Sequence, residues 1–481
     1  MNLIYEKFYI DGRWVQPETA NRINVISAST EETIGQVPDG SEADIDAAVS
    51  AARRAFDDPS GWAHLDPVDR NAVLERFADE IESRSAETVQ RVSAQNGMPV
   101  SVGAASEGTA PAVLLRYYVG LMAALPTEEV REGLFSGTTV IRREPIGVVA
   151  AIVPWNFPQS LTFMKLAPAL AAGCTVVLKP SPETVLDAFL VAEAAEAAGM
   201  PPGVLNIVPG GREVGAHLVS HPGIDKVSFT GSTAAGRQVG EVCGRLLRPV
   251  TLELGGKSAA IVLDDAELAP DLGKFFAATM LNSGQTCYLG TRVLAPRSRY
   301  DEVVDLLAAM VASLKVGDAL DPETQLGPLS SARQRDRVEA YIAKGLGDGA
   351  RLVAGGGRPT GLDRGWFIEP TIFADVDNRS TIAQEEIFGP VLSVIPYANV
   401  DDAIAIANDS DYGLGGSVWS PDTDRAMAVA RRVQTGTIGI NSFDMDIGSP
   451  FGGVKASGMG RELGPEGLAA NQVIKSIYRQ Y

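Results

Sequence analysis

From about residue 147 onward, β-branched runs alternate with alanine-rich stretches, and this alternation constrains the fold more than any other feature. Residues 146–153 and 175–178 are short apolar runs of strand length. Residues 161–172 and 185–198 follow them and have the composition of helices. Continuously apolar strands separated by helices are typical of a parallel sheet that helices cover on both faces. The sequence therefore predicts an α/β fold with a doubly wound parallel sheet.

The same alternation starts again after Glu253. Predicted strands lie at 259–263, 291–294, 391–395 and 437–440, and predicted helices at 272–282, 300–314, 332–346 and 402–407. A chain of 481 residues is longer than one hydrophobic core usually serves. We therefore expect two doubly wound domains, the first from residues 1–124 and 145–254 and the second from residues 255–455. The residues before about 120 are expected to be mainly helical.

A segment between the helical part and the first parallel strand alternates around Gly133 and Gly137, which predicts a β-hairpin that protrudes from the main body. Residues 473–478 alternate as an edge strand does. Exposed strand edges usually find a partner. We therefore expect residues 125–144 and 463–481 to be oligomerisation segments of a homo-oligomer, either a dimer or a tetramer. An ordinary surface hairpin is the alternative.

Composition excludes several classes of partner. The formal net charge is −19, so the chain lacks the basic footprint that nucleic acids and anionic membranes require. Three cysteines are too few for a disulfide framework and indicate a reducing compartment. No apolar run reaches the length of a membrane span, and the first residues do not form a secretion signal. We expect a cytoplasmic protein that acts on a small molecule.

Cys287 and Glu253 are the residues that point most directly to chemistry. Cys287 follows the polar, turn-like residues 283–286, whereas Cys174 begins an apolar strand and Cys243 lies within a helix. A thiol needs a nearby cation or a helix N-terminus to act as a nucleophile, and a lone cysteine is more often a small buried residue. Glu253 lies in an apolar strand, where desolvation raises the pKa of a carboxyl group and suits it to act as a base. The pair fits a reaction in which the thiol attacks a carbonyl and the carboxylate activates water.

Further polar residues lie where predicted strands end, the edge at which open α/β sheets bind ligands. Ser232 begins a helix after the strand at 226–229, so its hydroxyl and the amides there suit a pyrophosphate. The dinucleotide fingerprint has a glycine where Thr233 stands, so this match is partial. Lys179 suits ribose hydroxyls, and Asn156, set between two prolines, can offer its amide to an oxyanion. Taken singly, each is also an ordinary turn or structural residue.

Two other patterns predict no site. His217 and His221 are four residues apart, a spacing that suits a metal on a helix, but His221 precedes Pro222 and no third ligand lies nearby in the sequence. We therefore expect no metal. Residues 256–258 resemble the end of a phosphate-binding loop, but Thr251 stands where that loop requires a glycine.

Eight segments, taken together and in order, resemble those of the NAD(P)-dependent aldehyde dehydrogenase superfamily over nearly the whole chain. They are residues 8–14, 154–158, 179–181, 229–233, 253–257, 284–287, 385–390 and 450–458. The resemblance implies an aldehyde dehydrogenase fold in which the first domain is a Rossmann-like cofactor-binding domain and the second is catalytic. It also implies an enzyme that oxidises an aldehyde to a carboxylic acid with NAD, or with NADP.

The resemblance assigns the catalytic roles. Cys287 would attack the aldehyde, and the Asn156 amide with the Cys287 backbone N–H would hold the oxyanion of the thiohemiacetal. After hydride transfer, Glu253 would activate the water that hydrolyses the thioester. Lys165 matches a lysine that lies near the thiol in the family. Glu462 matches a deep carboxylate that relays protons.

The resemblance also assigns the cofactor contacts. Lys179 and Glu386 would hold the two riboses, Phe388 would pack beside the nicotinamide ribose, and Ser232 with the backbone near Trp155 would meet the pyrophosphate. The full set of expected cofactor-binding residues is Trp155, Lys179, Ser181, Glu183, Gly231, Ser232, Gly236, Leu254, Gly255, Glu386 and Phe388.

The cofactor preference rests on one departure from the family pattern. Many NAD-preferring members have a glutamate three positions after the equivalent of Lys179, where this chain has Pro182 and places Glu183 one residue further on. We expect NAD rather than NADP because no arginine lies nearby in the sequence to bind a 2′-phosphate, and because Glu183 would disfavour one.

The expected substrate tunnel is apolar. Met164 stands where several family members have a bulky aromatic residue, and the other expected lining residues are Phe157, Phe163, Phe443 and Phe451. The mapped segments supply no arginine to pair with a substrate carboxylate, so an uncharged aliphatic or aromatic aldehyde is favoured over a semialdehyde acid. Asp444 and Asp446 near the expected mouth would instead suit a cationic aminoaldehyde.

Two other readings are disfavoured by the same residues. CoA-acylating members generally lack the glutamate base, which is present here as Glu253. A non-catalytic protein with this fold would not be expected to keep Asn156, Glu253 and Cys287 together.

Overall fold

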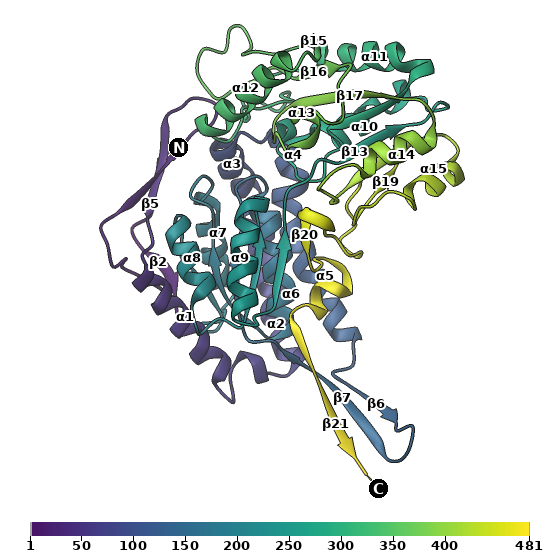
Figure 1. The fold of residues 1–481 in the computed structure, drawn as a ribbon. Coiled ribbons are helices and arrows are strands. Elements are labelled where there is room, and N and C mark those ends of the chain that lie inside the picture. The colour runs from purple at the N-terminus through teal and green to yellow at the C-terminus, as the bar shows by residue number, and fades with distance from the viewer. Residues whose placement is uncertain (1, 481) are drawn as a thin grey trace.

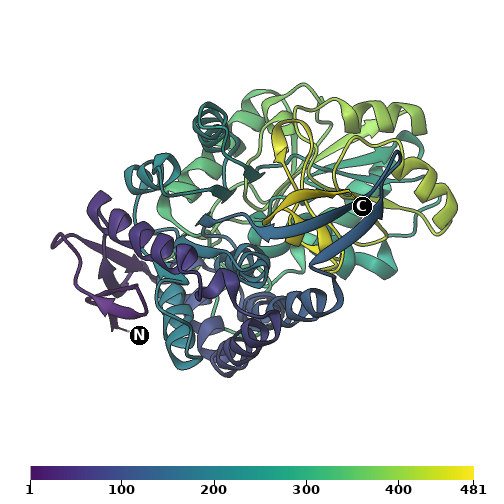
Figure 2. The ribbon, with the colours of Figure 1, turned by 90° about the horizontal axis from the view of Figure 1, so that it is seen from below.

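The computed structural model describes residues 2–480 and contains two α/β domains, with an arm that extends from one end (Figure 1). No helix within these residues is long and apolar enough to cross a membrane. The two domains lie side by side, and the C-terminal strand runs along the arm (Figures 1 and 2).

The first domain is formed around an eight-stranded sheet. Its strands are β2 (Phe8–Ile10), β3 (Arg13–Val15), β8 (Val148–Ile152), β9 (Thr175–Lys179), β10 (Leu205–Ile207), β11 (Lys226–Thr230), β12 (Val250–Glu253) and β20 (Gly458–Met459). The order across the sheet is β20-β12-β11-β8-β9-β10-β2-β3, and the strands from β12 to β10 are parallel. Ile152 pairs with Lys179 and Thr230 with Glu253, so the carboxyl ends of these strands meet at one edge.

Helices cover both faces of this sheet. They are α1 (Glu42–Asp57), α2 (Pro67–Ser83), α5 (Ala110–Ala124), α6 (Pro158–Ala172), α7 (Leu186–Ala197), α8 (Arg212–Ser220) and α9 (Thr233–Arg245). In β8, Val149 and Ala151 pack with α2, α5, α6 and α7, whereas Val148 and Ala150 pack with α1, α8 and α9. Both sides of each central strand are therefore buried, which explains the continuous apolar runs in the sequence.

The second domain repeats this arrangement around a seven-stranded sheet. Its strands are β13 (Ala259–Val262), β14 (Arg292–Pro296), β15 (Arg351–Ala354), β16 (Thr371–Ala374), β17 (Val391–Tyr397), β18 (Gly416–Trp419) and β19 (Gly439–Ile440), and its helices are α10 (Leu272–Met280), α11 (Tyr300–Ala312), α12 (Ala332–Gly347), α13 (Thr381–Gln384), α14 (Val400–Asn408) and α15 (Thr423–Ala430). The order is β15-β16-β17-β14-β13-β18-β19, with only β15 antiparallel to its neighbour. The predicted α/β class with parallel sheets is confirmed.

The N-terminal segment differs from the prediction. Besides β2 and β3, it forms a small sheet of β1 (Leu3–Ile4), β4 (Arg22–Ile26) and β5 (Thr33–Pro38) before the first helix begins. The expectation of mainly helical structure before residue 120 is therefore wrong for the first 38 residues. These strands are short and lack a regular apolar alternation, so the sequence pattern did not show them.

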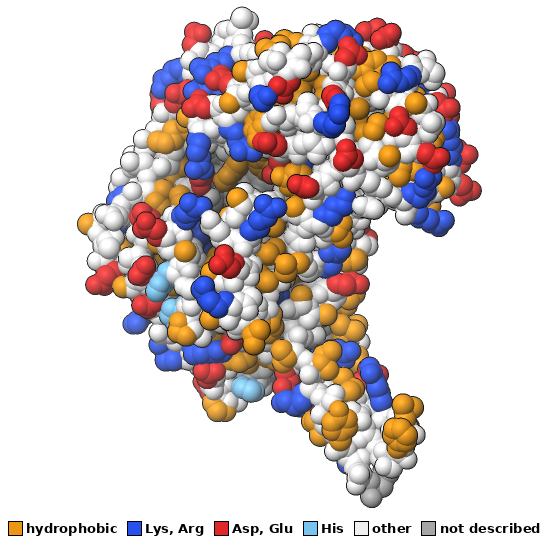
Figure 3. Space-filling model, viewed as in Figure 1, with side chains coloured by type: hydrophobic (Ala, Val, Ile, Leu, Met, Phe, Trp, Pro, Cys, Tyr) orange, Lys and Arg blue, Asp and Glu red, His pale blue; other side chains and the backbone are white. Residues whose placement is uncertain are grey.

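The arm is the predicted hairpin. It consists of β6 (Glu128–Glu132) and β7 (Thr138–Pro145), and β21 (Gln472–Arg479) pairs antiparallel with β7 along its full length. Leu134 and Phe135 at the hairpin tip are fully exposed. Apolar side chains gather on this arm in the space-filling view (Figure 3).

Candidate active site

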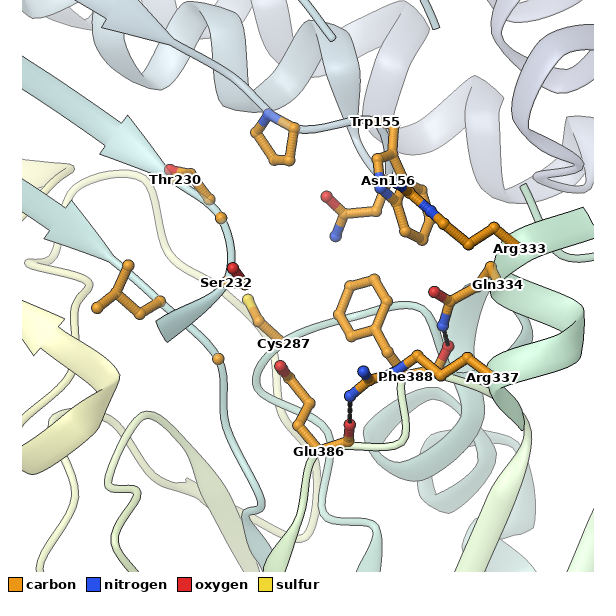
Figure 4. A pocket seen from close by; sticks show the side chains of 14 residues that line it. Trp155, Asn156, Thr230, Ser232, Cys287, Arg333, Gln334, Arg337, Glu386 and Phe388 are labelled. Carbon is orange, nitrogen blue, oxygen red and sulfur yellow. Dashed lines mark hydrogen bonds between the residues drawn. The ribbon is translucent and has the colours of Figure 1, made fainter. Parts of the chain in front are cut away.

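The candidate site lies at the carboxyl edge of the first sheet, where the second domain faces it. A cavity of about 420 Å³ there is lined by Trp155, Asn156, Thr230, Gly231, Ser232, Leu254, Gly255, Cys287, Arg333, Gln334, Arg337, Glu386 and Phe388, among others (Figure 4). The sheet edge supplies the residues from β8, β11 and β12, whereas the second domain supplies Cys287, Glu386, Phe388 and the start of α12. Segments distant in the sequence thus meet where the predictions placed a ligand.

The chain turns sharply before Cys287. Helix α10 ends at Met280, two residues earlier than predicted, and Asn282, Ser283 and Gly284 all have positive φ angles. A Cβ on Gly284 would lie 2.0 Å from the carbonyl oxygen of Gly389, so only glycine fits there. Burial raises the pKa of the Cys287 thiol, and the carboxyl groups of Glu386 and Glu253 raise it further. The thiol is therefore protonated until a base takes its proton.

Asn156 lies in the cavity beside Cys287 and is almost fully buried. Its side-chain Nδ2 donates to the backbone oxygen of Gln285, 3.0 Å away, in the loop that ends at Cys287. Its own backbone oxygen accepts from Asn96 and Asn282. These bonds hold the Asn156 amide close to the cysteine loop, as an oxyanion donor requires.

Glu253 ends β12 and is buried, but it lines none of the cavities around Cys287. Neither of its carboxylate oxygens has a hydrogen-bond partner. Burial raises its pKa well above the ordinary value, and the nearby Glu462 adds to the rise. The predicted desolvation of this carboxyl is therefore present. To reach a water beside Cys287, its side chain must turn into the cavity.

Lys165 and Glu462 form a buried ion pair beside Glu253. The Lys165 Nζ lies 2.6 Å from Glu462 Oε1 and donates at the same distance to the Thr230 hydroxyl. Ser228 also donates to Glu462 Oε1, whereas Oε2 has no partner. Glu253, Lys165 and Glu462 thus lie close enough for the charges of the last two to shift the pKa of Glu253.

A second cavity, of about 760 Å³, continues the first along the sheet edge. It is lined by Lys179, Ser181, Glu183, Trp155, Gly231 and Ser232, together with residues of α8 and α9. The buried Lys179 Nζ donates to the backbone oxygens of Pro180 and Gly210, and burial lowers its pKa to about 8. Ser232 caps α9 by accepting from the Ala235 amide.

Glu386 and the glycines beside it form a close-fitting wall. Its carboxylate accepts from the Gly256 amide at 3.0 Å, and burial raises its pKa to about 7. A Cβ on Gly255 would lie 2.3 Å from Glu386 Oε2, which explains the glycine at that position. Gly236 lines neither cavity. The Leu254 side chain packs directly against Gly236. Gly236 therefore has a packing role instead of the predicted cofactor contact.

The structure adds three residues that the sequence did not predict. Arg333, Gln334 and Arg337 all come from the first turns of α12, and Gln334 and Arg337 donate to the backbone oxygens of Phe388 and Glu386 (Figure 4). Arg333 lies 2.9 Å from the carboxylate of Glu183. The expectation that no arginine lies near the predicted 2′-phosphate position is therefore wrong, because α12 brings one from 150 residues away.

A third cavity, of about 500 Å³, reaches Cys287 and Asn156 from the other side. It contains the predicted Phe157, Met164 and Phe451, and unpredicted Leu114, Leu161, Leu281, Tyr288, Met445, Ile447 and Leu463. Phe443 lies behind this wall, stacked on Tyr288 at 4.3 Å between ring centroids, and Phe163 packs in the core against Phe77. Both were expected to line the tunnel, and neither does.

His217 and His221 do have a third polar partner, contrary to the expectation from sequence. Asp46 Oδ1, from α1, lies 2.6 Å from His217 Nε2 and 3.3 Å from His221 Nε2. However, His221 Nδ1 accepts from the Gly223 amide, so the proton of the neutral ring is on Nε2 and faces Asp46. The cluster is therefore explained by hydrogen bonds between the histidines and the aspartate.

Known proteins match this fold and site along nearly the full chain. The aldehyde dehydrogenase family model matches residues 14–477. Geranial dehydrogenase of Castellaniella defragrans is 56% identical over 99% of both chains, and a 3-succinoylsemialdehyde-pyridine dehydrogenase of a Pseudomonas species is 44% identical over 98% of both.

Solved structures of aldehyde dehydrogenases also match this chain over nearly its full length. A Mycobacterium tuberculosis aldehyde dehydrogenase complexed with NAD⁺ has a TM-score of 0.97 and 49% identity, covering 100% of this chain and 99% of that one. A mutant of aldehyde dehydrogenase C from Pseudomonas syringae, complexed with NAD⁺ and octanal, has a TM-score of 0.94 and 42% identity, covering 98% and 96%. The chain belongs to the aldehyde dehydrogenase family, and the expected class of enzyme is confirmed.

Proposed function

We propose that the protein oxidises an uncharged, apolar aldehyde of medium chain length to its carboxylic acid, with NAD as the hydride acceptor. The observation that carries this proposal is the meeting of two different cavities at Cys287 and Asn156. One is the polar groove along the sheet edge, and the other is the tunnel of about 500 Å³. None of the residues lining that tunnel, within the described chain, carries a charge.

The groove fits a dinucleotide by its own residues. Lys179 and Glu386 are buried at separate positions along it and would bind the ribose hydroxyls. The α9 N-terminus at Ser232, which lines both cavities, would face the pyrophosphate. Ser181 and Glu183 lie at the Lys179 end, and Phe388 lies beside Trp155 at the other. NAD, when bound, accepts the hydride that the aldehyde carbon gives up.

The residues around the tunnel end would perform the remaining steps. The Cys287 thiol would give its proton to water in the cavity, because Glu253 lines none of the cavities around it. The thiolate adds to the carbonyl carbon, and the Asn156 amide donates to the resulting oxyanion. Once the thioester has formed, Glu253 removes a proton from the attacking water. Glu462, whose charge raises the pKa of Glu253, and Lys165, which pairs with Glu462, would pass that proton on.

Two relatives support the choice of substrate class. Geranial is an apolar aldehyde, and the structure complexed with octanal holds another. The name of the succinoylsemialdehyde-pyridine relative supports a semialdehyde as the second candidate. The aminoaldehyde alternative is weaker, because Asp446 already accepts from Gly448 and Ser449 within its own loop.

A panel of aldehydes assayed with NAD and NADP separately tests the proposal. We expect the highest kcat/KM with octanal or geranial and NAD. Preference for a carboxylated semialdehyde or an aminoaldehyde would overturn the substrate class. Preference for NADP would overturn the cofactor, and it would assign Arg333 to the 2′-phosphate.

We also propose that the arm joins copies of this chain into a homo-oligomer. Val130, Ile474, Ile477 and Tyr478 are exposed apolar side chains along its strands, in addition to Leu134 and Phe135 at the tip. Light scattering of the wild type and of the double variant Leu134→Ser, Phe135→Ser tests this. A wild-type protein that is monomeric at micromolar concentration would refute it.

A further inference from the structure

Two walls of the aldehyde tunnel come from separate parts of the first domain. One wall is the continuous helical segment formed by α4 (Val100–Gly103), the π-helical turn η2 (Ala104–Thr109) and α5. It contributes Ser106, Ala110 and Leu114 to the lining. The other wall is the start of α6 and the residues just before it. The distance between these walls sets the width of the tunnel.

Glu107 joins the two walls. It lies in the π-helical turn, is 1% exposed, and its carboxylate points at the N-terminus of α6. Oε2 accepts from the Gln159 amide at 2.7 Å, and Oε1 accepts from the Ser160 hydroxyl at 2.7 Å and from the Ser160 amide at 3.4 Å. The Ser160 hydroxyl is also 3.1 Å from the backbone oxygen of Ser106.

Helix α6 depends on this carboxylate because it has no cap of its own. The first amides of a helix lack partners within the helix, and a side chain of the preceding residue usually satisfies them. Here that residue is Phe157, whose side chain cannot accept a hydrogen bond, and the next is Pro158, which has no N–H. Glu107 therefore supplies the cap from another segment. Burial raises its pKa to about 7, and above that pH its negative charge suits the positive end of the helix.

A second set of buried hydrogen bonds holds the start of α6. Gln159 donates its side-chain amide to the buried Asp187 at 2.6 Å, and Gln95 donates to the other oxygen of that carboxylate at 2.9 Å. The start of α6 is thus fixed on one side by Asp187 and on the other by Glu107. Phe157 and Met164 lie on or beside this helix, whereas Asn156, just before it, is held separately by the side chains of Asn96 and Asn282.

We propose that Glu107 is a positioning residue for long aldehydes: by capping α6 from the π-helical turn, it fixes the spacing of the two tunnel walls. This inference rests on the proposed function. A short aldehyde fills only the part of the tunnel near Cys287, so its kcat/KM does not depend on that spacing. A long aldehyde contacts both walls, so loosening them lowers its binding in the transition state.

The test compares octanal with propanal in the full-length enzyme. In Glu107→Ala we expect the ratio of kcat/KM for octanal to that for propanal to fall at least fivefold, through KM for octanal, while kcat with propanal changes less than twofold. Glu107→Gln keeps one acceptor oxygen and should restore part of the ratio. Ser160→Ala removes the hydroxyl partner and also makes the tunnel wall there more apolar, so it should lower the ratio less than Glu107→Ala does.

Asp44→Ala is the matched control. Asp44 is also a buried carboxylate at a helix N-terminus, where it accepts from the backbone amides of Ser41 and Glu18 in the capping box of α1, and it does not line the tunnel. We expect a comparable loss of thermal stability with an unchanged ratio. An equal change of ratio in this control would show a general structural effect and overturn the inference.

The inference is also wrong if the ratio stays within twofold of wild type in both Glu107 variants. Should Glu107→Ala not fold, Glu107→Gln and Ser160→Ala decide the matter by the same ratio. Wild-type protein that oxidises neither aldehyde would instead refute the proposed function, so the two failures are distinguishable.

Discussion

The cofactor groove and the aldehyde tunnel meet at Cys287 and Asn156, yet they are constructed differently. The groove follows the carboxyl edge of one parallel sheet, and its polar residues come directly after β8, β9, β11 and β12. The tunnel is lined by apolar side chains from helices and loops that no sheet edge aligns, including Leu114, Met164 and Phe451. The groove is therefore defined by strand topology, whereas the tunnel is defined by how separate segments pack.

Because of this difference, we expect that a substitution can impair either aldehyde oxidation or NAD binding without impairing the other. Cys287→Ala removes the nucleophile at the junction, so we expect dehydrogenase activity to fall by at least about 10³-fold. NAD binding should persist, because the groove residues keep their positions. NADH production and quenching of tryptophan fluorescence on NAD addition measure the two effects. Loss of NAD binding in this variant would show that the structure of the groove depends on the Cys287 side chain.

Glu253→Gln should give the next largest effect. The glutamine keeps the shape of the side chain but cannot accept a proton, so thioester hydrolysis should slow by about 10²–10³-fold. A burst of NADH equivalent to one product per active site should then precede slow turnover. Rapid-mixing absorbance measures this burst. Unchanged turnover would exclude Glu253 as the base and leave its burial beside Lys165 and Glu462 as a structural feature.

Met164→Trp should act on the tunnel alone. A larger side chain in a packed wall fills space that a long substrate needs, so we expect kcat/KM for octanal to fall about 30-fold. Propanal oxidation and the Kd for NAD should change little. The matched variant Met164→Leu conserves volume and should keep octanal activity within a few-fold. An equal loss for both aldehydes would mean that the substitution disturbs Lys165, its neighbour in α6.

The difference between groove and tunnel also explains which site residues could be predicted from the sequence. Glu253, Lys179 and Ser232 lie in or just after strand-like runs, so their meeting at one edge followed from the parallel topology. Cys287 follows a predicted helix and turn, and only the family resemblance placed it beside them. The aldehyde dehydrogenase resemblance assigned the catalytic role of Asn156, which its two flanking prolines alone left open as that of an ordinary turn residue.

The remaining features depend on long-range packing that local patterns do not encode. The Arg333–Glu183 pair joins α12 to the first domain, and Phe443 lies behind Tyr288 rather than in the tunnel. No local pattern distinguishes Glu107, which the π-helical turn buries.

The smallest expected effect is a pH dependence confined to the groove. Burial raises the pKa of Glu386 to about 7, and ribose hydroxyls bind the ionised form better, so NAD affinity should rise as the pH increases through 7. At pH 6 about one such carboxyl in ten is ionised, which limits the loss of affinity to roughly tenfold. Burial lowers the pKa of Lys179 to about 8, so the gain should end above that pH as the lysine loses its proton. Fluorescence titration of NAD from pH 6 to 9 should therefore show the lowest Kd between about 7 and 8, and Glu386→Gln should abolish only the acidic limb. A wild-type Kd that is flat across this range would mean that NAD binding does not depend on the charge of either buried group.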